Sequence, residues 1–92
     1  MIVRISGEGQ FRLPDEDAAR LNELDNKAVA AVDAGDEAGF QELWQQMLGI
    51  VESDGKELGD DELCESDVIM PPRDVSFEEA KADFTGEGLI PD

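Results

Sequence analysis

The stretch ISGEGQFRLP, residues 5–14, holds the pattern closest to a ligand-binding motif, because two glycines flank a glutamate. A dinucleotide-binding fingerprint needs a third glycine three positions after the second, followed by a helix. Arg12 occupies that position, and the alternating residues around it indicate a strand. The sequence contains no Walker pattern either. We therefore interpret the two glycines as part of a hairpin turn and not as a phosphate-binding loop.

The side chains that usually carry catalysis or bind metals are absent or scattered. The sequence has no histidine, and its one cysteine, Cys64, lies among acids that disfavour the reactive thiolate. Two acidic clusters, at residues 15–17 and 60–62, do not match the spacing of a calcium loop. No pair of carboxylates stands out for acid–base chemistry. The sequence therefore predicts a protein that is not an enzyme and has no metal site and no cofactor.

Alternation of apolar and polar residues on both sides of the glycine turn predicts an antiparallel β-hairpin. Matching the apolar side chains across the strands pairs Val3 with Leu13 and Ile5 with Phe11. This register leaves a three-residue loop that needs a left-handed residue at its end, and Gly9 supplies it.

The predicted register makes Arg4 and Arg12 the candidate binding residues, because it places them opposite each other on the face away from the core. Like charges in that position are unfavourable unless acids neutralise them. Those acids belong either to this chain, with Glu8 and Asp15 close by, or to an acidic partner surface. The second possibility assigns partner binding to Arg4 and Arg12.

Two helical patterns follow the hairpin. Apolar residues recur at spacings of three and four over residues 21–32 and again over residues 40–51, where Trp44 is assigned to the core. Gly35 is expected to end the first helix, and Asp36 to cap the second. Because this connection is so short, the two helices must form an antiparallel αα-hairpin.

The remainder of the chain mixes loops with short elements. We expect an acidic loop over residues 56–67 and then a strand, Val68–Met70, placed at a sheet edge by the prolines that follow it. Ser76 and Glu79 form a capping box that opens a short helix. The last segment, residues 86–91, is either a strand or a docked tail.

Together these elements predict a single α+β domain over residues 1–92. In this fold class an N-terminal β-hairpin and a short third strand form a small antiparallel sheet. The sheet packs on the antiparallel αα-hairpin, and a short C-terminal helix completes the domain. A chain of this length buries a small core, so a second copy of the chain is also a candidate partner.

The charge of the chain limits its partners. Twenty-four acidic residues against 7 basic ones give a net charge of -17, which repels nucleic-acid phosphate and anionic lipid headgroups. We therefore expect no nucleic-acid binding and no direct membrane binding. No apolar run is long enough to span a membrane, and the first residues lack the features of a signal peptide, which predicts a cytoplasmic protein.

Four segments carry a resemblance to a known family: IVRISGEGQFRLP, LNELDNKAVAAVDAGDEAGFQELWQQML, DELCESDVIMPP and GEGLIP. With these four segments in this order, the chain resembles the PspA-associated protein family, PspAA, over nearly all of its 92 residues. Members of that family are small proteins linked with phage shock protein A, a coiled-coil membrane-remodelling protein of the envelope stress response. The family has no established catalytic residues.

The resemblance implies a non-catalytic adaptor or regulator that binds phage shock protein A and reaches the inner face of the membrane through it. Two alternatives stay open. A small-molecule-binding module would need a pocket with convergent polar groups. An acidic nucleic-acid mimic would need acids at phosphate-like spacing along one face, whereas here they are spread through the chain.

Overall fold

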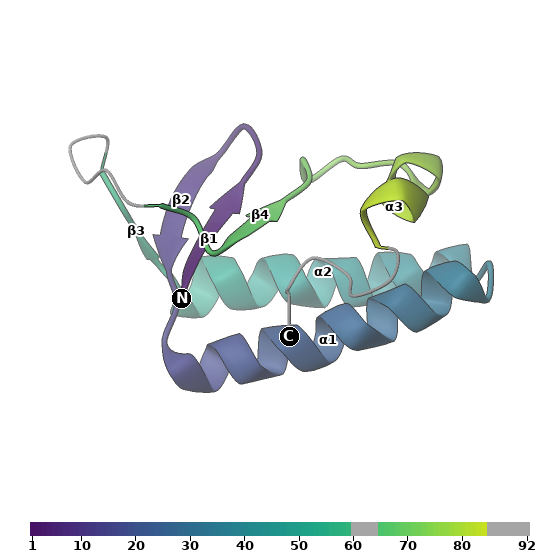
Figure 1. Ribbon diagram of the computed structural model, residues 1–92, viewed down its shortest axis with the longest axis horizontal. Coiled ribbons are helices and arrows are strands. Elements are labelled where there is room, and N and C mark those ends of the chain that lie inside the picture. The colour runs from purple at the N-terminus through teal and green to yellow at the C-terminus, as the bar shows by residue number, and fades with distance from the viewer. Residues whose placement is uncertain (60–64, 85–92) are drawn as a thin grey trace.

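The computed structural model describes residues 1–59 and 65–84, and it confirms the predicted α+β class. A small sheet lies against a pair of long antiparallel helices, and a short helix packs at the end of the pair where the two long helices are joined (Figure 1). The elements follow the order β1 (Ile2–Ile5), β2 (Gly9–Arg12), α1 (Asp15–Asp33), α2 (Glu37–Asp54), β3 (Lys56–Glu57), β4 (Val68–Met70) and α3 (Phe77–Asp83).

Strands β1 and β2 form the expected antiparallel hairpin, but the predicted register was wrong by two residues. Val3 pairs with Phe11, and Ile5 pairs with Gly9. The chain reverses through a β-turn in which the Glu8 amide donates to the Ile5 carbonyl at 2.9 Å. A shift of two residues leaves every side chain on the same face, so the division between core and solvent in this hairpin is still the predicted one.

Turn geometry explains this register. Gly7 has a φ of 85° and Gly9 a φ of 115°, so both glycines adopt conformations that L side chains rarely take. Gly7 stands third in the turn, where a type II turn requires a positive φ. The left-handed conformation expected at Gly9 is confirmed, while the need for glycine at position 7 was not predicted.

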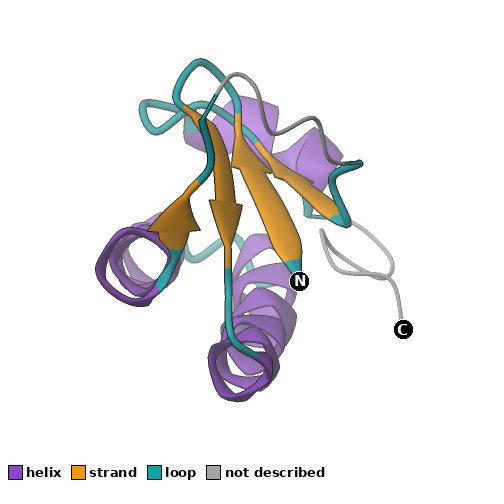
Figure 2. Ribbon diagram, turned by 90° about the vertical axis from the view of Figure 1, so that its left-hand side faces the viewer, coloured by secondary structure: helices purple, strands orange, loops and turns teal. Residues whose placement is uncertain are grey.

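The sheet has four strands in the order β3-β2-β1-β4 (Figure 2). The expected strand at Val68–Met70 is present and occupies an edge, but it pairs with β1 in parallel, with Val3 opposite Val68. The prediction of an antiparallel sheet was therefore wrong, because the connection from β3 leads to the opposite edge and returns the chain in the direction of β1. Strand β3, paired antiparallel with β2, lies in a segment that was expected to be a loop.

The junction between the two long helices lies where it was predicted, because α1 ends at Asp33, close to Gly35, and α2 begins at Glu37. Asp36 caps α2 as expected, since its side chain accepts a hydrogen bond from the Gly39 amide at 3.0 Å. At α3, the Ser76 hydroxyl accepts from the Glu79 amide at 3.2 Å, which confirms this half of the capping box. The predicted terminal strand or tail at residues 86–91 lies outside the described residues.

A continuous core fills the space between the sheet and the helices. Its largest fully buried side chain is the predicted core residue Trp44, whose Nε1 donates to the Arg73 carbonyl at 3.1 Å. Trp44 and Phe40 stack with ring centroids 6.3 Å apart, and Phe84 meets both rings edge-on. One acid, Asp25, is also fully buried within α1, although its type predicts a surface position.

Candidate functional site

The face of the sheet that points away from the helices is open to solvent. Side chains alternate along each strand, so Val3 and Ile5 point into the core while Arg4 between them is exposed. On the edge strand β4, Val68 and Met70 are buried in the same way, and Ile69 is 64% exposed. A large apolar side chain with this much exposure lies beside Arg4, its neighbour across the β1–β4 ladder.

The structure places both predicted binding arginines on this open face but does not place them opposite each other. Arg4 faces Gln10, and Arg12 faces Ile2 on one side. On its other side Arg12 faces Lys56 of β3, so the like charges that meet directly are those of Arg12 and Lys56. Sequence reasoning missed Lys56 because Lys-Glu in an acidic stretch has little strand propensity. Only the β2–β3 pairing brings it to the site.

These three cations differ from the other basic side chains in their surroundings. The chain has 7 basic residues, and four of them form ion pairs: Arg20 with Asp17, Lys27 with Glu23, Arg73 with Glu8 and Glu52, and Lys81 with Glu78. Within residues 1–59 and 65–84, Arg4, Arg12 and Lys56 form no ion pair. The basic side chains without an acid partner in this part of the chain are therefore gathered on one sheet face.

Glu8, one of the acids expected to neutralise the arginines, binds elsewhere. Its carboxylate accepts two hydrogen bonds from Arg73, at 2.9 Å from Nη2 and 3.2 Å from Nε. This contact raises the pKa of Arg73. Arg73 also pairs with Glu52 of α2, so its side chain ties the hairpin turn to the helix pair. Glu8 therefore serves the fold and does not neutralise Arg4 or Arg12.

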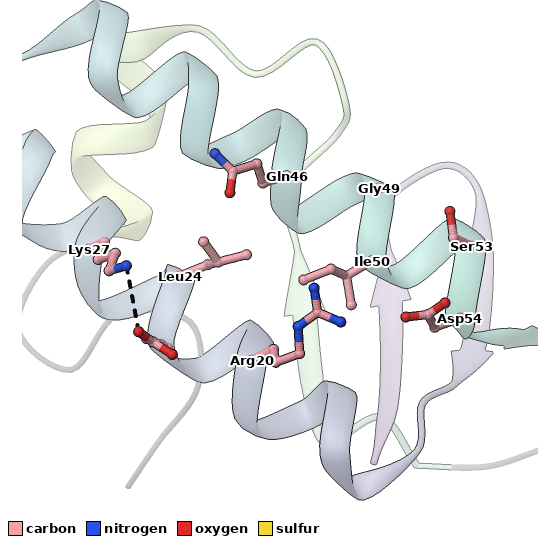
Figure 3. Close-up of a pocket in the computed structure, with 9 residues that line it drawn as sticks. Arg20, Leu24, Lys27, Gln46, Gly49, Ile50, Ser53 and Asp54 are labelled. Carbon is pink, nitrogen blue, oxygen red and sulfur yellow. Dashed lines mark ion pairs between the residues drawn. The ribbon is translucent and has the colours of Figure 1, made fainter.

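A second surface feature is a groove of about 430 Å³ between α1 and α2 (Figure 3). Leu24 and Ile50 point toward each other across it, and charged side chains of Arg20, Lys27 and Asp54 lie along its rim. The groove runs open along the helix pair, so it lacks the enclosure by which small-molecule sites bury most of a ligand's surface.

At one end of the groove two carboxylates meet. A hydrogen bond with Asp54 raises the pKa of Asp17 above its usual value, and partial desolvation and the charge of Asp54 act in the same direction. Arg20, whose Nη1 lies 3.6 Å from an Asp17 carboxylate oxygen, lowers it in part. The pair joins the first turn of α1 to the last turn of α2.

Within residues 1–59 and 65–84, no group of three or more metal-ligating side chains comes together, and the acidic cluster at residues 15–17 is no exception. The cluster at residues 60–62 and Cys64 lie outside the described residues. Of the helices in that part of the chain, none is both long and apolar enough to cross a membrane.

Comparison with known protein families identifies a match over the whole chain. The model of a family described as PspA-Associated protein, PspAA, matches residues 1–92, the whole of this chain. No curated protein and no solved structure matches it.

Proposed function

Since this chain belongs to the PspA-associated protein family, we propose that it is a non-catalytic adaptor or regulator that binds phage shock protein A in the envelope stress response. The family match over residues 1–92 is the observation that carries this proposal. The exposed sheet face supports a binding role, because its three cations form no ion pair within residues 1–59 and 65–84 and its Ile69 is largely exposed.

We propose further that the protein is cytoplasmic and reaches the inner face of the membrane only through its partner. A net charge of -17 is repelled by anionic headgroups. Neither α1 nor α2 has a basic residue in its last turn, and both begin with acids, so neither resembles the basic amphipathic helices that adsorb to membranes.

Co-sedimentation with vesicles tests both parts of the proposal. The purified chain is mixed with vesicles of phosphatidylglycerol and phosphatidylethanolamine, with and without phage shock protein A. We expect it in the supernatant when alone and in the pellet when phage shock protein A is present. Pelleting without phage shock protein A would contradict indirect recruitment. Absence from the pellet in both cases, together with no complex in solution, would contradict the adaptor function.

A further inference from the structure

We propose that the open sheet face docks an acidic amphipathic helix, and that Lys56, Arg12, Arg4 and Ile69 are the side chains that contact it. This inference rests on the proposed function, because it names the surface and the chemistry of the partner element. It is carried by the arrangement of these four residues and by the observation that the three cations form no ion pair with the described residues of the chain.

The four side chains cross the sheet with one residue on each strand. In the strand order β3-β2-β1-β4, Lys56 belongs to β3, Arg12 to β2, Arg4 to β1 and Ile69 to β4. Lys56 is directly opposite Arg12, and Ile69 is directly beside Arg4. Arg12 and Arg4 are diagonal neighbours, since Arg4 pairs with Gln10, two residues before Arg12. The result is a stripe of three cations that ends in an exposed isoleucine.

The spacing of this stripe matches one face of a helix lying across the strands. Neighbouring strands are about 4.8 Å apart, and the diagonal step from Arg12 to Arg4 adds an offset of two residues along the strands. The three cations therefore span about 12 Å, and the isoleucine follows at about 16 Å. A helix rises about 1.5 Å per residue, so acids at positions i, i+4 and i+8 also span about 12 Å. An apolar residue at i+11 lies about 16 Å along the same face. An acidic helix with this pattern can place one side chain over each strand.

The electrostatics of the free surface favour such a partner. Lys56 and Arg12 are like charges in directly opposite positions, which is unfavourable without an acid between them. Carboxylates from a partner remove this repulsion, and each arginine can bind one of them through two hydrogen bonds. Asp67, the residue before β4, uses its Oδ2 to accept a hydrogen bond from the Ile2 amide at 2.8 Å.

The overall negative charge of the chain selects among acidic partners. The Debye length is about 8 Å at physiological ionic strength, so acids that contact the stripe interact with it more strongly than with the dispersed acids elsewhere. A segment whose carboxylates do not align with the cations experiences mainly repulsion. Nucleic acid and anionic lipid present long arrays of negative charge, which would place further phosphates against the acidic remainder of the molecule.

Neutralisation of the stripe tests the proposal by calorimetric titration. The test variant is Arg4→Gln/Arg12→Gln/Lys56→Gln, and the matched control is Arg20→Gln/Lys27→Gln/Lys81→Gln, which removes the same charge elsewhere. The ligands are phage shock protein A and a synthetic helical peptide with Glu at i, i+4 and i+8 and Leu at i+11. A scrambled isomer of the peptide controls for charge alone. Circular dichroism and thermal melts verify that each variant is folded.

We expect the test variant to weaken binding of both ligands by about 100-fold or more and the control by less than about 3-fold. Ile69→Ser should weaken binding by about 5–10-fold without changing net charge. Equal effects of the test and control variants, or equal binding of the scrambled peptide, would overturn the inference. So would binding of duplex DNA or phosphatidylglycerol vesicles through the same three residues.

The two ligands separate this inference from the proposed function. If phage shock protein A binds and the test variant binds it equally well, the docking surface is wrong and the adaptor function stands. If phage shock protein A does not bind but the peptide binds through the stripe, the adaptor function is wrong and the docking surface stands. Binding of neither ligand to the wild-type chain overturns both.

Discussion

At the scale of single residues, the contact between Asp17 and Asp54 makes the stability of the helix pair depend on pH. The hydrogen bond between the two carboxyl groups requires that one of them is protonated, and it raises the pKa of Asp17. A raised pKa in the folded state contributes stability at low pH, and this stability is lost as pH rises through the folded value. Above the raised pKa of Asp17 this hydrogen bond is lost, and the charge of Asp54 opposes the Asp17 carboxylate.

The corresponding prediction concerns Asp54→Asn. We expect this variant to melt at a higher temperature than the wild type near pH 7, because the amide removes the repulsion and can donate to the Asp17 carboxylate. The difference should shrink as pH falls through the raised pKa of Asp17, because the hydrogen bond between the two carboxyl groups then forms in the wild type. Thermal melts over this range measure it, and Asp33→Asn, an exposed acid on α1, is the control. A difference in melting temperature between Asp54→Asn and Asp33→Asn that does not change with pH would contradict a hydrogen bond between the two carboxyl groups.

The turn between β1 and β2 depends on Gly9. Its φ of 115° is strained for any residue with a side chain, although nothing lies within 4 Å of the position a Cβ would take. Gly9→Val should therefore lower the free energy of unfolding by on the order of 1–2 kcal/mol through backbone strain alone. Denaturant unfolding measures this value.

Glu8→Ala is the comparison for the same turn. It removes the pair with Arg73, in which the side chains are 33% and 45% exposed, so its cost should stay below about 1 kcal/mol. If Glu8→Ala costs more than Gly9→Val, the ion pair and not the backbone conformation determines the stability of the turn.

The sequence predicted which side chains of the β-hairpin point into the core, but it did not predict which residues pair across the two strands. Pairing Val3 with Leu13 or with Phe11 satisfies the apolar match equally well, so the turn decides, and its demand for two glycines at positive φ is hard to weigh in advance. Lys56 joined the candidate site for a similar reason. Its strand exists because β2 offers an edge to pair with, and no local pattern signals this.

At the scale of elements, α3 depends on its neighbours. A helix of 7 residues is too short to be stable by itself. Its ends are held by Phe77 and Phe84, whose ring centroids lie 5.9 Å and 5.1 Å from that of Phe40 in α2. Phe84 is fully buried, whereas Phe77 is only half-buried. The sequence predicted this helix from its cap, and the structure adds the aromatic contacts that stabilise it.

The two phenylalanines should therefore differ in their effects. Phe84→Ala leaves a cavity against Trp44 and Phe40 and should cost about 3–5 kcal/mol, with loss of hydrogen-exchange protection in α3. Phe77→Ala should cost clearly less, because part of its ring is already in water. Denaturant unfolding and amide exchange of both variants measure this, and similar costs at the two positions would show that α3 is held differently.

At the scale of the whole molecule, the charge of -17 opposes the compact state. Raising potassium chloride from about 10 mM to about 1 M shortens the Debye length from about 30 Å to about 3 Å, which screens the repulsion between dispersed acids. We therefore predict that the melting temperature rises with salt. An equimolar series in sucrose controls for general solute effects. A melting temperature that stays level or falls with salt would show that repulsion is not a main source of instability.

The parallel pairing of β1 with β4 also has a consequence for how the protein is made. Val3 must find Val68, 65 positions later in the chain, whereas the β-hairpin and the helix pair form between neighbouring segments. Contacts between distant residues form late because closing a long loop is costly in entropy. On the ribosome, the sheet therefore cannot be completed until almost three quarters of the chain has been synthesised. Until β4 emerges, the backbone groups of β1 that will pair with β4 have no partner strand. Strand β1 is therefore the strand through which two incompletely synthesised chains are most prone to pair with each other.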